Sequence, residues 1–138
     1  KELNERFTKQ ESSIVDIMPT IARFMKINIA PDIAREVDGV PLIGRLSLVE
    51  PSINFTKQQM TINWKAANKK EKIRIWMATT NKFKTGGKDE YQLLKEVPAG
   101  SQQTTIDLKD LPSSFYKIWL ESESNSVNRW LIIDNKAN

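Results

Sequence analysis

The sequence predicts a mainly β protein, a seven-stranded antiparallel β-sandwich with an N-terminal helical segment. The spacing of apolar residues changes from about 3.6 to 2 near Arg45. After that point, seven short alternating runs follow one another at intervals of about 8–14 residues. The connections between them are too short for parallel crossovers, which favours antiparallel pairing. These observations place residues 1–44 in the helical segment and residues 45–138 in the sandwich.

The seven predicted strands are separated by turn-forming residues. Pro51-Ser52 follows the first run, and Pro98-Ala99-Gly100 follows the fourth. The predicted strands are Leu46–Glu50, Met60–Ala66, Lys72–Thr79, Tyr91–Val97, Gln103–Leu108, Phe115–Glu121 and Asn128–Ile133. Their number and spacing resemble fibronectin type III-like and immunoglobulin-like sandwiches, an architecture that hosts many unrelated functions.

The helical segment contains one good helix start. Asp16 is a predicted N-cap, and Pro19 falls in the first turn, where a missing N–H costs little. An apolar stripe then recurs at helical spacing, formed by Ile17, Ile21, Phe24 and Met25. A second short helical turn is expected at Ile33–Glu36, and residues 1–11 are expected to be a frayed helical turn or a loose end.

Composition excludes several classes of site. The 138 residues contain no Cys and no His, which excludes a zinc finger, a disulfide framework, a thiol nucleophile and a histidine general base. The net charge of +4 is dispersed over strands and loops without a basic stripe, so we expect no nucleic-acid partner. No apolar run approaches the roughly 18 residues of a membrane span.

Two stretches of the helical segment resemble a known enzyme superfamily. Asp16-x-x-Pro19-Thr20 begins an apolar helix, and Asp38-Gly39-Val40-Pro41-Leu42 follows it. In this order they resemble the C-terminal part of the catalytic domain of alkaline phosphatase superfamily hydrolases. Sulfatases and type I phosphodiesterases or nucleotide pyrophosphatases are the most similar branches. The resemblance covers Asp16 to Ile43 and brings no active site with it.

The resemblance implies a non-catalytic C-terminal region of a larger secreted hydrolase. In the superfamily, a Ser, Thr or formylglycine nucleophile acts with metal ions held by Asp and His, and this chain has no His for that role. We therefore expect no catalytic residue, cofactor or metal in this chain, and zinc or calcium in the parent enzyme. The expected partner is the parent's catalytic domain, which the sandwich would pack against or orient. The chain begins at Lys1 without a methionine, so we expect an excised piece of a periplasmic or extracellular protein.

The tryptophans carry the remaining predictions. Trp64 alternates in phase with Met60 and Ile62 and is predicted to lie in the core. Trp76 and Trp119 are predicted to lie on the outer face of one sheet, close together, as an interdomain or ligand surface.

Three interpretations of this outer pair remain open: a docking surface, a sugar-stacking platform, or two side chains shielded by lysine stems. We favour docking and expect the stripe of Ile17, Ile21, Phe24 and Met25 to cover the pair. The alternative function is an independent carbohydrate-binding or surface-interaction module.

Overall fold

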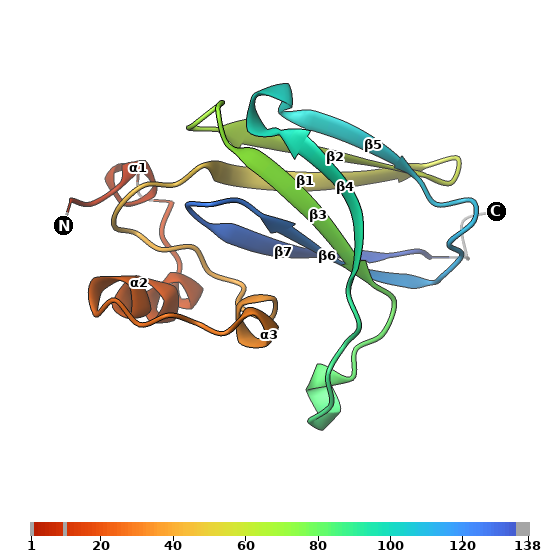
Figure 1. Cartoon of the computed structure of the whole chain (residues 1–138), viewed down its shortest axis with the longest axis horizontal. Coiled ribbons are helices and arrows are strands. Elements are labelled where there is room, and N and C mark those ends of the chain that lie inside the picture. Colours follow the sequence, from red (N-terminus) through yellow and green to blue (C-terminus); the bar gives the residue numbers. More distant parts are fainter. Residues whose placement is uncertain (1, 10, 135–138) are drawn as a thin grey trace.

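The computed structural model describes residues 2–9 and 11–134 and confirms a seven-stranded antiparallel β-sandwich. One sheet has the order β1-β2-β5, and the other has the order β4-β3-β6-β7. The helical segment lies at one end of the sandwich, and the β3–β4 loop extends out from the sandwich on the side of α3 (Figure 1). All neighbouring strands are antiparallel, as the short connections require.

The strands agree with the predicted runs to within a few residues, apart from the first. They are β1 (Leu48–Thr56), β2 (Gln59–Ala66), β3 (Lys72–Ala78), β4 (Gln92–Pro98), β5 (Gln103–Asp107), β6 (Phe115–Glu121) and β7 (Ser126–Ile132). The facing sides of the two sheets enclose one apolar core, which includes Trp64, Met60 and Ile62. Trp64 is 3 % exposed, so its predicted place in the core is confirmed.

The first strand was predicted to end before Pro51, and this is wrong. β1 continues through Pro51 to Thr56 because the pairing with β2 shifts register between Val49 and Ser52. Glu50 has a positive φ of 49° at this irregularity. Proline is tolerated here because β1 is an edge strand with a bulge, where no ladder N–H is needed.

The helices are short and precede the sheets. They are α1 (Glu5–Thr8), the 3₁₀ turn η1 (Ile14–Asp16), α2 (Ile17–Phe24) and α3 (Pro31–Ala34). α2 lies within the predicted helix, and α3 begins two residues before the predicted turn because Pro31 suits the first helical position. Two more 3₁₀ turns, η2 (Phe83–Thr85) and η3 (Ala99–Ser101), lie in the loops of the sandwich. Of the predicted terminal segment, Lys1 and Gln10 lie outside the described residues.

Candidate functional site

The outer face of the four-stranded sheet carries the two tryptophans singled out from the sequence. Trp76 on β3 is directly paired with Trp119 on β6, and their ring centroids are 6.3 Å apart. The neighbours of Trp76 along the strand, Ile75 and Met77, point into the core, so the pair lies on the opposite face. Trp76 is partly buried and Trp119 is only 3 % exposed. The predicted proximity and outward orientation are confirmed, and protein covers most of the pair.

Arg35, just after α3, covers this aromatic pair. Its guanidinium carbon lies 5.4 Å from the ring centroid of Trp76 and 5.0 Å from that of Trp119. The ring of Tyr91 lies 4.8 Å from the same carbon and forms a third wall. A cation within about 6 Å of an aromatic ring is attracted by the ring's quadrupole. We call Trp76, Tyr91 and Trp119 the aromatic cage.

The expectation that the α2 stripe covers the tryptophans is wrong. Ile17, Ile21, Phe24 and Met25 are between 50 % and 66 % exposed. α2 instead turns Pro19 and Ala22 toward the rest of the chain. Arg35 takes the place of the stripe because a guanidinium gains cation–π attraction from three rings, which an aliphatic side chain lacks.

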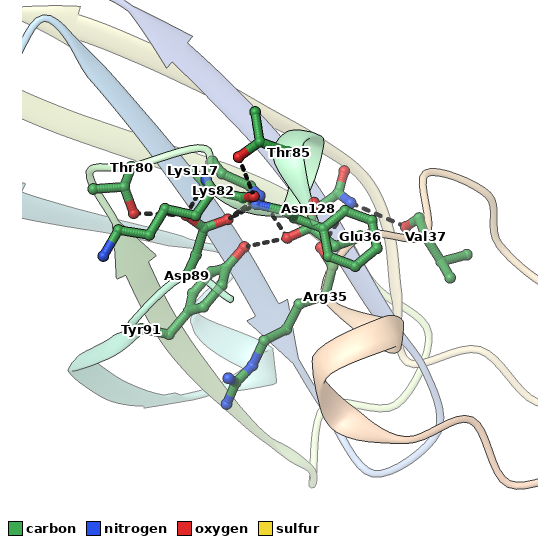
Figure 2. Close-up of polar contacts among 11 residues, drawn as sticks. Arg35, Glu36, Val37, Thr80, Lys82, Thr85, Asp89, Tyr91, Lys117 and Asn128 are labelled. Carbon is green, nitrogen blue, oxygen red and sulfur yellow. Dashed lines mark hydrogen bonds and ion pairs between the residues drawn. The ribbon is translucent and has the colours of Figure 1, made fainter. Parts of the chain in front are cut away.

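Lys117, next to the cage on β6, is the centre of a buried ion cluster (Figure 2). Its Nζ lies 2.5 Å from Glu36 Oε1 and 2.9 Å from Asp89 Oδ2. The side chains of Lys117 and Asp89 are each 1 % exposed, and that of Glu36 is 13 % exposed. Tyr91 Oη also donates to Glu36 Oε1, at 3.4 Å. The cluster joins the helical segment, the β3–β4 loop and β6, and we call Lys117, Glu36 and Asp89 the ion clasp.

Burial and the contacts of the ion clasp shift the pKa values of Asp89, Lys117 and the neighbouring Tyr91. Burial alone would raise the pKa of Asp89, but hydrogen bonds from Thr80, Lys117 and the Lys82 N–H lower it from 3.8 to about 2. Burial alone would lower the pKa of Lys117, yet its bonds to Glu36 and Asp89 raise it above 10.5. Burial also raises the pKa of Tyr91 to about 12. All three groups therefore keep their neutral-pH charge states well beyond the ordinary range.

These shifts predict a stability profile with two limits. The stabilisation from Asp89 is present above about pH 4 and is lost as the pH falls toward 2, because the unfolded carboxylate binds a proton first. That from Tyr91 is present below about pH 10 and is lost as the pH rises toward 12. That from Lys117 is lost as the pH rises through the raised pKa of its ammonium group.

Urea unfolding of wild type and Asp89→Asn at several pH values checks the acid limit. The stability difference between them should shrink by about 2 kcal/mol between pH 5 and pH 2. A difference independent of pH would contradict the proposed environment of Asp89. The two proteins must be compared because Glu71 also has a lowered pKa, so both of them lose the stabilisation from Glu71 at low pH.

Asn128 on β7 fixes the backbone of the helical segment on the same face of the sheet. Its Nδ2 donates to the carbonyl oxygens of Arg35, at 2.9 Å, and of Val37, at 3.1 Å. Arg23 of α2 makes a similar link, because its guanidinium donates to the carbonyls of Ile43 and Ser124. Side chains of the sandwich and the helical segment therefore cap backbone groups across the junction, and this holds the two parts in one relative position.

The two stretches that carry the superfamily resemblance bind each other. Asp16 Oδ1 accepts from the Val40 N–H at 2.7 Å, and Thr20 Oγ1 accepts from the Leu42 N–H at 2.9 Å. Gly39 approaches the backbone so closely that a Cβ there would lie 1.9 Å from the Val15 carbonyl oxygen. The spaced pair of motifs is therefore one structural unit, in which the second stretch is tied to the start of the helix.

Asp16 occupies the predicted N-cap position of α2, but the expected hydrogen bond from its carboxylate to the first turn of the helix is absent, so that part of the prediction is wrong. The side chain is 1 % exposed, and Oδ2 accepts instead from the Ser13 N–H at 2.8 Å and from Arg6 at 3.2 Å. With Val40 on Oδ1, the carboxylate already has three donors outside α2. Asp16 thus joins three segments of the chain.

Asp16→Ala is expected to lower the free energy of unfolding by about 1–3 kcal/mol, because buried N–H donors lose their acceptor. Chemical denaturation measures this, with Asp110→Ala as an exposed control expected within about 0.5 kcal/mol of wild type. Equal stabilities for the two variants would contradict the role of Asp16 as a junction.

The helical segment leaves a large apolar surface uncovered. Seven apolar side chains between residues 14 and 27 are from 48 % to 82 % exposed: Ile14, Ile17, Met18, Ile21, Phe24, Met25 and Ile27. α2 buries only Pro19 and Ala22, and most of its other apolar side chains lie exposed on one side of the helix. We call these seven side chains the apolar face. An amphipathic helix normally buries its apolar side against another surface.

Among the described residues, two of the cavities at the junction lie beside the cage. One of about 610 Å³ lies between α2, α3 and the β6–β7 turn and reaches Trp119. The other, of about 330 Å³, lies between α3 and the β3–β4 loop. Its walls include Arg35, Tyr91, Glu36 and Asp89, so it opens beside both the cage and the clasp. Both volumes are in the range of small-molecule pockets.

Sequence reasoning placed Trp76 and Trp119 but missed Arg35, Tyr91 and the ion clasp. Lys117 had one usable signal, because it alternates with the core residues Tyr116 and Ile118 and shares the face of Trp119. Nothing local indicated that this lysine is buried, since Glu36 lies 81 positions away in the sequence.

Within residues 2–9 and 11–134, no group of three or more acidic side chains is placed to hold a metal ion. No helix in that part of the chain has the length and apolar character needed to cross a membrane. Comparison with protein-family models, curated proteins and solved structures found no match.

Proposed function

We propose that this chain is the non-catalytic C-terminal region of a larger, secreted hydrolase resembling the phosphodiesterase and sulfatase branches of the alkaline phosphatase superfamily. The helical segment completes the catalytic domain, and the sandwich is an accessory module that packs against or orients that domain. Catalysis and its zinc or calcium ions belong to the rest of the parent protein.

The single observation that carries this proposal is the apolar face. Burying one large apolar side chain is worth about 1.5–3 kcal/mol, and seven lie about half or more exposed on one short segment. A monomeric protein rarely leaves so many large apolar side chains of one short segment in water, and exposed apolar surface of this kind marks an interaction site. The clasp, the cage and Asn128 hold the segment to the sandwich, so a domain covering the apolar face would be oriented relative to the sandwich.

Oxidation of the methionines in the whole protein tests the proposal. Met18 and Met25 belong to the apolar face, whereas Met60 and Met77 are in the core and serve as internal controls. Dilute peroxide should oxidise Met18 and Met25 at least about tenfold more slowly in the whole protein than in this chain, because sulfoxide formation follows exposure. Equal rates would contradict a covering domain.

The coding sequence upstream of Lys1 and the activity of the purified chain give a second test. The upstream sequence should encode a nucleophile-bearing strand–helix unit with Asp and His metal ligands. This chain alone, supplied with zinc or calcium, should not hydrolyse a model phosphodiester or sulfate ester. Metal-dependent turnover by the purified chain would refute the assignment of catalysis to the rest of the protein.

The alternative, a carbohydrate-binding module, is favoured by a different side chain. Trp130 on β7 is 51 % exposed, and Phe115 meets it edge to face at 5.3 Å, which holds its ring in place. An exposed, fixed indole is suited to stacking on a sugar ring. Saturable binding of an oligosaccharide by wild type but not by Trp130→Ala would support this alternative.

A further inference from the structure

The aromatic cage has the geometry of a site for an organic cation. Its rings come from β3, from the residue before β4 and from β6, and they surround one guanidinium carbon at 4.8–5.4 Å. Three aromatic faces around one charge are the arrangement by which proteins recognise quaternary ammonium groups. In this structure the cation is supplied by the same chain, through Arg35.

The hydrogen-bonding groups of the site do not match a guanidinium. Arg35 Nε and Trp119 Nε1 are both buried and have no hydrogen-bond acceptor among the described residues. A buried donor without an acceptor costs free energy, and the guanidinium brings such a donor to the site at Nε. A quaternary ammonium brings none. It would gain the attraction of the three rings without adding an unpaired donor.

A route to the cage is present. The cavity of about 330 Å³ is lined by Arg35 and Tyr91. Its other charged walls are Asp32, Glu36, Lys88 and Asp89, and the three carboxylates are ion-paired with Lys88 or Lys117. Figure 2 shows the Arg35 side chain extending away from Glu36 and Asp89, on the side of Tyr91. A ligand in this cavity would therefore meet Tyr91 first.

The displacement of Arg35 requires only a side-chain movement. The carbonyl oxygens of Arg35 and Val37 are held by Asn128, and Glu36 is held by Lys117. These bonds keep the backbone around residue 35 on the sheet when the guanidinium leaves the rings. The rest of the junction can therefore stay in place while the cage exchanges its occupant.

We propose that Trp76, Tyr91 and Trp119 form a binding site for a quaternary ammonium ligand of the size of choline, and that Arg35 occupies this site as an internal ligand. The ligand and Arg35 compete for the same rings. This site is independent of the apolar face and of the parent's hydrolytic activity.

Titration of the full chain with choline chloride at constant ionic strength, followed by calorimetry and tryptophan fluorescence, tests the proposal. Wild type should bind choline weakly, and Arg35→Ala should bind it at least about tenfold more tightly, because the tethered competitor is gone. The uncharged isostere 3,3-dimethylbutan-1-ol should bind Arg35→Ala at least about tenfold more weakly than choline does, because it lacks the charge that the rings attract.

Two further variants establish where the ligand binds. Tyr91→Leu in the Arg35→Ala background removes one wall and should weaken choline binding about fivefold or more. Trp130→Ala in the same background removes an exposed tryptophan outside the cage and should leave the affinity unchanged. Circular dichroism checks folding, and Arg35→Gln replaces Arg35→Ala if the latter unfolds. The proposal is overturned if no folded variant binds choline saturably, if choline and its isostere bind equally, or if Tyr91→Leu has no effect.

Discussion

Lys117→Met is expected to lower the free energy of unfolding by about 3–5 kcal/mol. Lys117 is 1 % exposed, and its Nζ contacts the carboxylates of Glu36 and Asp89. Without the ammonium, two partly or fully buried carboxylates lie close together with no compensating charge. Removing one member of a buried ion cluster is costly for this reason, whereas replacing all members together is much less so.

Urea denaturation of matched variants checks this prediction. Lys72→Met removes an exposed lysine from the neighbouring strand β3, where it pairs with Glu96, and should cost less than about 1 kcal/mol. Combining Lys117→Met with Glu36→Gln and Asp89→Asn should recover a large part of the loss, because the carboxylate charges go too. A triple variant less stable than Lys117→Met would mean that lost packing or lost hydrogen bonds, rather than uncompensated charge, causes the effect.

Trp64→Ala is also expected to cost about 3–5 kcal/mol, through the loss of packing in the core. Trp64 on β2 is 3 % exposed, and its Nε1 donates to the Ala99 carbonyl at 2.8 Å. The substitution leaves a cavity between the sheets and removes the indole hydrogen bond to the Ala99 carbonyl, which keeps only its bond from the Gln102 N–H. Both losses act in the same direction.

The comparison for Trp64 is Trp130→Ala, which removes the same side chain from an exposed place on β7. This control should lose about 1 kcal/mol or less by thermal or chemical denaturation. If Trp64→Ala lost no more than Trp130→Ala, the orientation of β2 in the sandwich would be contradicted.

The faces of the strands were predictable because alternation is a local property. In a strand, successive side chains point to opposite sides, so the period of Met60, Ile62 and Trp64 placed them on one face. The same rule placed Trp76 and Trp119 on the outer face of the other sheet. The continuation of β1 past Pro51 was missed because a bulge depends on the partner strand.

The candidate site was only half predictable. The sequence showed two outward tryptophans and an apolar helix, and we paired them because both needed burial. The structure instead covers the tryptophans with Arg35 and leaves the apolar face in solvent. An apolar stripe specifies that a partner is needed but not which surface supplies it, because the hydrophobic effect is non-directional.

By itself, the sequence determined the sandwich, the core position of Trp64 and the proximity of Trp76 to Trp119. These depend on alternation and turn residues, which act over a few positions. Only the tertiary structure decided that Asp16 binds Val40, that Arg35 enters the cage and that Lys117 is buried with Glu36. Those contacts join residues that are 24 to 84 positions apart in the sequence. Ion pairs and hydrogen bonds act over a few ångströms, so they form between such residues only after folding has brought them together.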